Sequence, residues 1–453
     1  MNSSATPQTA LFREAVLFWL KLGFISFGGP AGQIATVHQE LVDKRHWISE
    51  KRFLHALNYC MILPGPEALQ LVIYIGWLLH RTIGGIIAGF LFIFPALLLL
   101  IVLSIVYVTF GSTPFVTGIF LGIKPAVTAI VIAAGYRISK KILKKPIHFV
   151  IALLAFISMQ FKVPYPIIII LAGVLGFIIH KIKPDWMASN SHASHKNNSN
   201  ENRIKAIIDD DSEQLPHTKF KTYKFFSVLA ISILLFAIPF GLLISVYGQN
   251  HLFTELAWFF SKAAFLTFGG AYAVLPYVFQ ATVENFHWLS TAQMMDGLAL
   301  GETTPGPLII VVTYVGFVAS YFNTLVLNSP IFTGIIGAIV VSWFTFLPSF
   351  CFIFLGGPFI ESTRKELRLI PILNGITCAV VGVIANLALF FAVHTLFPDQ
   401  ISISSVNQHF IFALTLMVLA SIALLKYGQS IIRVLIVCAI IGLIGNYLNL
   451  NYF

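Results

Sequence analysis

Long apolar runs alternate with short polar loops along almost the whole chain. The runs hold 15 to 31 mostly apolar residues, and a helix needs about 20 to cross a bilayer. The short runs 146–160 and 164–180 are alternatively a hairpin that does not fully cross. The strict alternation of a membrane-spanning strand is not seen. The pattern therefore predicts an all-α polytopic membrane protein. Thirteen transmembrane segments are expected, at residues 8–28, 53–80, 84–108, 114–136, 146–160, 164–180, 225–247, 252–270, 292–322, 330–356, 370–396, 408–426 and 430–450.

One stretch interrupts the apolar pattern. Residues 181–224 are rich in Ser, Asn and mixed charge, a composition typical of a flexible linker. Their three histidines do not have the spacing of metal ligands. The expected domains are an N-terminal membrane half (1–180), a polar linker (181–224), a connecting transmembrane helix (225–251) and a C-terminal membrane half (252–453).

The two halves repeat each other. The run KLGFISFGG at 21–29 matches KAAFLTFGG at 262–270, which lies 241 residues later. Pro-Gly-Pro at 64–66 matches the same tripeptide at 305–307 with the same offset. Matches of Lys, Gly and Pro without gaps indicate a duplication. Further matches at an offset of 253 relate Gly122, Ile123, Ala126 and Val127 to Gly375, Ile376, Ala379 and Val380.

An odd number of segments separates the equivalent loops 30–52 and 271–291, so the halves are expected to be inverted repeats, as in many secondary transporters. Lys and Arg collect on the cytoplasmic side of membranes. With the N-terminus and linker inside and the C-terminus outside, twenty Lys and Arg face inward and five face outward. The basic loop 30–52 is the exception to this topology: either it lies outside and dips into a vestibule, or the first segment does not cross fully.

Composition narrows the class of protein. Apolar residues make up 57% of the chain and charged residues only 10%, whereas soluble proteins hold about 25% charged residues. A soluble enzyme, a nucleic-acid binder and a disordered protein are therefore excluded, and the net charge of +10 fits basic loops on one membrane face. The four cysteines form no C-x-x-C pair, and neither a metal site nor a cofactor is expected.

Two lysines occupy matched positions inside apolar runs. Lys21 and Lys262 each lie six residues before a Phe-Gly-Gly. A Lys inside a membrane helix costs several kcal/mol unless it faces a cavity or a partner, so the pair is predicted to bind an anion. The alternative is that both side chains snorkel to the headgroups.

The residues after these lysines are also matched. Ser26 and Thr267 precede the glycine pairs, which allow close backbone approach and unwound helix. Amides freed there would bind an oxyanion, although close helix packing explains glycine pairs equally well. The glycines concerned are Gly28, Gly29, Gly269 and Gly270.

The two Pro-Gly-Pro units interrupt apolar runs. Two prolines around a glycine cannot sustain a straight helix, so each run is expected to break into half-helices. The N-terminus of a half-helix attracts anions, and matched breaks in two halves indicate the substrate site of a transporter. The predicted substrate-binding residues are therefore Pro64, Gly65, Pro66, Pro305, Gly306 and Pro307.

Two carboxylates break the symmetry of the repeat. Glu67 follows the first Pro-Gly-Pro, where the second half has Leu308, and Glu302 precedes the second one, opposite Met61. Intramembrane carboxylates relay protons or hold cations, so both are candidates for coupling transport to a proton. Charge balance for a nearby Lys is the alternative.

The run FGGPAGQIATVHQELVDKRHWISEKRFLHALNYCMILPGPEALQL at 27–71 resembles the signature of the chromate ion transporter family. FLTFGGAYAVLPYV at 265–278 and GETTPGPLIIVVTYVGF at 301–317 are similar to the family's C-terminal half. The resemblance implies a long-chain, two-domain member with halves of opposite topology. The implied activity is chromate export across the bacterial inner membrane, which confers chromate resistance, and not an enzymatic reaction.

The substrate and its coupling stay open at this point. Chromate and sulfate are both tetrahedral dianions, so a sulfate or other oxyanion permease that moves chromate incidentally is one alternative. A non-transporting membrane scaffold or sensor is another. The expected partners are an oxyanion and the lipid bilayer, without nucleic acid. The oligomeric state is open, with a homo-oligomer as one alternative.

The topology gives a first testable prediction. Reporter fusions at residue 200 and at Phe453 should report opposite sides of the membrane, with residue 200 in the cytoplasm, because of the charge asymmetry between the two faces. Reporters on the same side would contradict both the orientation and the inverted repeat.

Overall fold

A computed structural model of the chain describes residues 12–27, 29–187, 206–209, 217–268, 271–323, 328–363, 370–397 and 406–448. The described part is helical apart from one isolated β-bridge. The N-terminal half contains α1 (Phe12–Ile25), α2 (Gly29–His38), the π-helical turn η1 (Gln39–Lys44), α3 (Glu50–Cys60), α4 (Glu67–Phe110), α5 (Pro114–Ile142), α6 (Pro146–Gln160) and α7 (Tyr165–Ile182).

The short α8 (Pro184–Met187) and the long α9 (Thr222–Tyr247) lie between the halves. The C-terminal half contains α10 (Leu252–Leu266), α11 (Ala271–Phe279), the π-helical turn η2 (Gln280–Asn285), α12 (Thr291–Thr303), the 3-10 turn η3 (Leu308–Ile310), α13 (Val311–Asn323), α14 (Pro330–Thr363), α15 (Ile370–Leu396), α16 (Val406–Leu425) and α17 (Ile431–Tyr447).

Both Pro-Gly-Pro units break their helices, as predicted. The chain leaves α3 after Cys60 and re-enters a helix at Glu67, and it leaves α12 after Thr303 and re-enters at Leu308. Pro66 and Pro307 come directly before the new helix starts. A proline is tolerated there because the first amides of a helix have no partner within it.

Each broken segment turns back on itself. Arg52, near the start of α3, and Tyr74, on α4, both donate hydrogen bonds to the carboxylate of Glu361 on α14. In a straight helix these two residues would lie about 33 Å apart. In the other half, Asn323 at the end of α13 donates to the carbonyl oxygen of Trp288, just before α12, at 3.2 Å. Both segments are therefore hairpins of two half-length helices.

A second pair of hairpins precedes these. Arg45, directly after η1, contacts Glu14 near the start of α1 at 2.7 Å, so the chain returns to the level at which α1 began. In the C-terminal half, Phe259 of α10 packs against Trp288, as its equivalent Phe18 of α1 packs against Trp47. The two halves therefore begin with the same pair of hairpins.

The prediction of thirteen full crossings is wrong for the hairpin segments. The fourteen residues of α1 rise about 21 Å, less than the roughly 30 Å of a bilayer core, and the 53–80 and 292–322 runs double back. Six described helices are long and apolar enough to cross a membrane. They are α4, which kinks at His80 and Arg81, together with α5, α7, α9, α14 and α15; α6, α16 and α17 are shorter apolar helices.

For the basic loop 30–52, the structure favours the alternative in which the first segment does not cross fully over a loop on the side opposite the linker. Ile48 pairs with Ile208 of the linker in a parallel β-bridge, and the Ser49 amide donates to the Ile208 carbonyl oxygen at 3.0 Å. The loop therefore lies on the linker side, and its cations join the other basic residues there. The hairpins explain this placement, since a first segment that turns back does not change sides.

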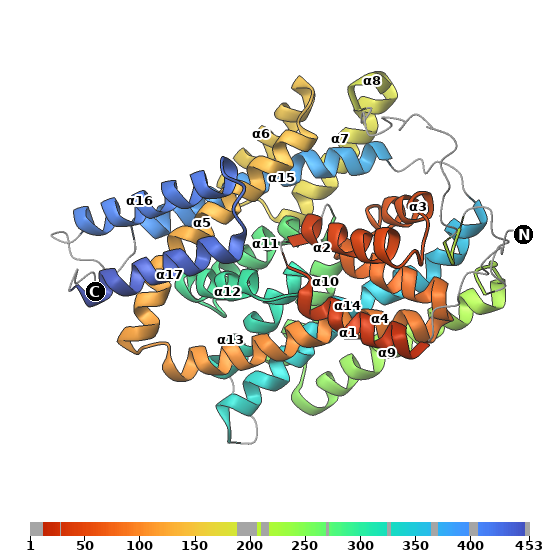
Figure 1. The fold of residues 1–453 in the computed structure, drawn as a ribbon, viewed down its shortest axis with the longest axis horizontal. Helices are drawn as coiled ribbons and strands as arrows, with labels where there is room; N and C mark the ends of the chain where they lie inside the picture. The colour runs from red at the N-terminus through yellow and green to blue at the C-terminus, as the bar shows by residue number, and fades with distance from the viewer. Residues whose placement is uncertain are drawn as a thin grey trace, which may run out of the picture.

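The halves interlock through their later helices (Figure 1). In the N-terminal half α5 packs against α16 and α17, and in the C-terminal half α15 packs against α6 and α7. Glycines make this approach close: a Cβ at Gly122 would lie 1.8 Å from the Cys438 carbonyl oxygen, and one at Gly375 would lie 2.3 Å from that of Ala172. Gly122 and Gly375 are equivalent positions of the repeat, so the same contact is made twice.

The buried ion pair that closes one hairpin gives a prediction on stability. Arg52 is 8% exposed and Glu361 1% exposed. Arg52→Gln should lower the free energy of unfolding by about 3–5 kcal/mol, because it leaves a buried carboxylate without its cation. Reversible denaturation in mixed micelles measures this.

The exposed pair Lys44–Glu40, at 2.6 Å, serves as the matched control. Lys44→Gln should change the free energy of unfolding by less than about 1 kcal/mol. Equal effects of the two substitutions would show that Arg52 does not hold the hairpin ends together.

Candidate functional site

The turns of the four hairpins meet inside the molecule. They contain Ser26, Thr267 and the two Pro-Gly-Pro units, and are here called the tips. The Gly65 amide donates to the Thr267 carbonyl oxygen at 2.7 Å, and the Gly306 amide donates to the Ser26 carbonyl oxygen at 2.8 Å. Gly65 and Gly306 are equivalent positions, as are Ser26 and Thr267. The glycine amide of each Pro-Gly-Pro break therefore donates to a carbonyl oxygen at the end of a half-helix in the opposite half.

The break glycines have a backbone and a packing that exclude side chains. Gly65 has φ +126° and Gly306 has φ +93°, a region that L-residues rarely adopt. A Cβ at Gly65 would lie 2.8 Å from Ser349 Oγ on α14, and one at Gly306 would lie 2.8 Å from Ala96 Cβ on α4. Ser349 and Ala96 are themselves 253 residues apart, so each break rests on the long helix of the other half.

A cavity of about 1170 Å³ reaches the tips from the side of the linker. Its inner end is formed by Met61 and Glu67 of one half and by Phe268 and Tyr272 of the other. Its walls come from α2, α3, α5 and α15. The cavity therefore lies between the two halves, at the place where transporters built from repeats bind their substrates.

The cavity is rich in cations. Basic side chains at the end of α5 line its outer part, and the N-termini of α2 and α4 face its inner part with the partial positive charge of a helix start. Two carboxylates, Asp43 and Glu67, also line it. The excess of positive charge favours an anion over a cation in this cavity. The lining cations are Arg137, Lys141, Lys144 and Lys145.

Both predicted coupling carboxylates lie at the inner end of the cavity. Glu67 is the first residue of α4 and lines the cavity itself. Glu302 is buried at the end of α12 and accepts a hydrogen bond from the Tyr272 hydroxyl at 2.9 Å. Because the Tyr272 ring also lines the cavity, both carboxylates are within one side chain of it.

The predicted substrate-binding residues divide into two groups. Ser26, Gly29, Thr267 and both Pro-Gly-Pro units lie at the tips, although none of them is among the residues that line the cavity. Lys21 and Lys262 are exposed and do not line it either; Lys262 Nζ lies 5.5 Å from the centroid of the Trp258 ring. Gly28, Gly269 and Gly270 lie outside the described residues.

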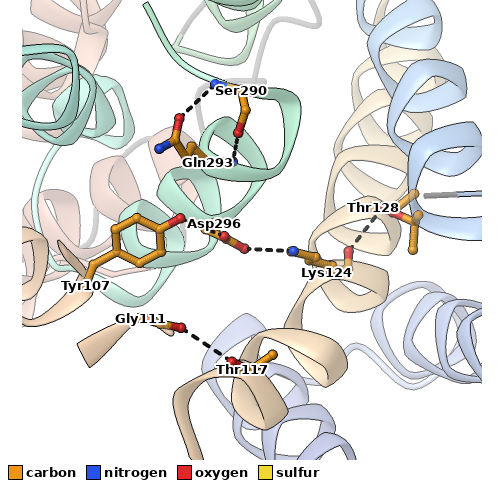
Figure 2. A network of polar contacts seen from close by, with 9 residues as sticks. Tyr107, Gly111, Thr117, Lys124, Thr128, Ser290, Gln293 and Asp296 are labelled. Atoms are coloured by element: carbon orange, nitrogen blue, oxygen red, sulfur yellow. Dashed lines mark hydrogen bonds and ion pairs between the residues drawn. The ribbon is translucent and has the colours of Figure 1, made fainter. Parts of the chain in front are cut away.

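Several polar residues in or beside the cavity are not among the predicted site residues. Arg137 and Lys141 line the cavity, and in the sequence they count only among the Lys and Arg assigned to the cytoplasmic face. Lys124 on α5 and Asp296 on α12 form an ion pair at 3.6 Å, and Tyr107 donates to Asp296 at 3.0 Å (Figure 2). The signal was present, since Lys124 and Asp296 are charges inside apolar runs, the property that singled out Lys21 and Lys262.

Among the described residues, no group of three or more His, Cys, Asp or Glu side chains is placed to hold a metal ion.

Comparisons with known proteins agree with the two-half architecture. A family model described as "Chromate transporter" matches residues 13–177 and 254–443. The chromate transport protein of Pseudomonas aeruginosa is 29% identical over 447 residues, which cover 98% of this chain and 94% of the relative. That of Cupriavidus metallidurans is 25% identical over 393 residues, 86% of this chain and 85% of the relative.

A shorter relative corresponds to a single half. The uncharacterized transporter YwrB of Bacillus subtilis is 27% identical over 191 residues, which are 95% of its own length but 41% of this chain. No solved structure matches the chain significantly.

The cavity can be tested with one introduced cysteine. Met61 is 40% exposed at the inner end of the cavity, whereas the neighbouring native Cys60 is fully buried. Met61→Cys should react with a small hydrophilic thiol reagent at least about tenfold faster than Cys60, and sulfate or chromate should slow the reaction. Mass spectrometry of the labelled peptide gives both rates.

Cys60 is the internal control, since it differs only in facing the protein interior. Gly65 is not a suitable probe, because any side chain there meets Ser349. A Met61→Cys variant as inert as Cys60 would show that water does not reach the tips from this side.

Proposed function

The chain belongs to the chromate transporter family, and on that premise we propose that it is a secondary transporter that exports chromate, a tetrahedral oxyanion, from the bacterial cytoplasm. The single observation that carries the proposal is the cation-lined cavity that ends at the four tips, between the two halves. A family of chromate transport proteins implies an oxyanion substrate and a membrane setting.

The proposed topology is an inverted repeat with half-spanning hairpins. Between the loop before α3 and the equivalent loop before α12, five segments cross: the later part of α4, then α5, α6, α7 and α9. An odd number of crossings gives the halves opposite orientations. The domain division into two membrane halves, a polar linker at 181–224 and a connecting helix at 225–251 follows the same plan.

The direction of transport follows from the charges. The linker and the basic loop 30–52 lie on one side, and the positive-inside rule favours that side as the cytoplasmic one. The C-terminus then lies outside the inner membrane. The cavity opens on the linker side, so the cations of α5 collect the anion from the cytoplasm.

Binding is proposed to take place at the tips. The anion passes the cations of α5 and reaches Ser26, Thr267 and the half-helix amides around the Pro-Gly-Pro breaks. Glu67 and Glu302 flank this place and are proposed to take up a proton as the anion leaves, which couples export to proton entry. The binding role of Lys21 and Lys262 stays a prediction, and their exposure fits the snorkelling alternative.

The experiment is flux into everted membrane vesicles, with labelled chromate and sulfate and with and without ionophores. Arg137→Gln combined with Lys141→Gln should reduce chromate flux about tenfold, because the cavity then loses two cations that attract the anion. Lys140→Gln is the matched control, since Lys140 is exposed on the same helix and is not part of the lining. Lys21→Ala with Lys262→Ala tests the matched lysines in the same assay.

The outcomes separate the alternatives. Sulfate flux that exceeds chromate flux and is inhibited by chromate would identify a sulfate permease. Absence of flux of either anion, with normal protein levels, would favour the scaffold or sensor. Full flux in the Lys21 and Lys262 double variant would show that both side chains only snorkel.

A further inference from the structure

The cavity is open on one side of the tips and closed at the equivalent place on the other. Leu54 on α3 and Met61, directly after it, line the cavity and are 41% and 40% exposed. Their equivalents on α12, 241 residues later, are Met295 and Glu302, which are 2% and 9% exposed. The repeat therefore implies a second pathway, on the far side from the linker, which is packed shut in this conformation.

Lys124, which forms an ion pair with Asp296 (Figure 2), lies at a position that the repeat assigns to this second pathway. Thr377 on α15 lines the open cavity, and its equivalent on α5, 253 residues earlier, is Lys124. Asp296 lies on α12, the equivalent of the cavity-lining α3. Asp296 is also six residues, about 9 Å along the helix, before Glu302, which Tyr272 joins to the open cavity.

The pair is held loosely for a buried ion pair. Lys124 Nζ lies 3.6 Å from Asp296 Oδ1, and the two side chains are 28% and 7% exposed. Asp296 Oδ2 accepts a hydrogen bond from Tyr107 at 3.0 Å, whereas buried Oδ1 has no hydrogen-bond partner.

The far-side equivalents of the cavity cations Arg137 and Lys141 are Phe390 and His394, whose rings stack at 3.8 Å.

From this geometry, and resting on the proposed function, we propose that Lys124 is a second oxyanion subsite on the far side of the tips. In the present conformation the Asp296 carboxylate occupies it as an internal counter-ion. Sulfate and chromate present the same negative oxygens to an ammonium group as a carboxylate does. An anion that leaves the tips toward the far side replaces Asp296 at Lys124.

Replacement of Asp296 by an anion at Lys124 couples anion binding to the opening of the far pathway. While Asp296 is paired with Lys124, α12 is held against α5 and the far pathway is closed. An anion that takes the place of Asp296 removes this contact, so it stabilises the state in which α12 has moved away. Thr377, the equivalent of Lys124, carries no charge, so this residue cannot form the equivalent ion pair on the open side.

The test uses Met295→Cys as a reporter of the far pathway, in a background without the four native cysteines. A membrane-impermeant thiol reagent is applied from the side of the C-terminus. The reporter should be nearly inert in the parent. Asp296→Asn should raise its reactivity about tenfold, the ratio that corresponds to roughly 1.4 kcal/mol, because the ion pair no longer holds α12 against α5.

A second measurement distinguishes an anion subsite at Lys124 from an ion pair that only holds α12 against α5. In the Asp296→Asn variant, Lys124 has no carboxylate partner, so sulfate should protect the reporter more than chloride at equal ionic strength. Adding Lys124→Gln should abolish this protection, and Lys124→Arg should keep part of it, since the charge remains. Reactivity that rises without sulfate-specific protection would overturn the subsite.

A variant with the two charges exchanged keeps the proposal falsifiable if Asp296→Asn fails to fold. Lys124→Asp combined with Asp296→Lys should restore an inert reporter, because the ion pair is rebuilt in reverse. Glu40→Gln, which removes the exposed Lys44 pair, is the matched control and should leave the reporter inert. A reporter that reacts equally in all variants would overturn the proposal.

The thiol readout does not require transport. Loss of chromate and sulfate flux in the parent, together with the expected reporter pattern, would reject the proposed function and keep the anion subsite. Normal flux with a reporter that is insensitive to Asp296 would keep the proposed function and reject the anion subsite.

Discussion

The structure depends on how backbone groups are satisfied at four helix breaks deep inside an apolar protein. Unpaired amides and carbonyls cost several kcal/mol each where water is absent. Here Gly65 donates to Thr267 and Gly306 donates to Ser26, so each half supplies what the other lacks. Neither set of hairpins can complete its hydrogen bonds alone, which explains why the two halves interlock and why both breaks need a glycine with positive φ.

The same arrangement gives the site its asymmetry. The cavity on the linker side is open and lined by the cations of α5, whereas the equivalent positions on the far side are packed: Met295 is buried, the Phe390 ring is stacked and Lys124 is paired with Asp296. A duplicated sequence provides two conformations of similar energy, because each half can adopt the packing of the other. The proposed exporter would exchange these two arrangements around the fixed tips.

The sequence predicted the helical class, the two halves and the break points, because Pro-Gly-Pro and matched glycines act locally. It could not predict that residues 53–80 turn back, because the apolar pattern is the same in a run that crosses the membrane and in one that forms a hairpin. Arg52 and Tyr74 meet only through Glu361, nearly 300 residues away. Charge counts likewise assigned Lys141 to the cytoplasmic side but could not show that it lines a cavity, which depends on how α5 packs against α2 and α15.

The central claim, two equivalent pathways of which one is open at a time, is tested most directly by distances between spin labels. The exposed pair Lys51 and Lys144 spans the mouth on the linker side, and its equivalents Ala292 and Phe397, also exposed, span the far side. Saturating sulfate or chromate should shorten the first distance and lengthen the second in the same molecules. Distances that stay fixed, or that change in the same direction, would contradict the account.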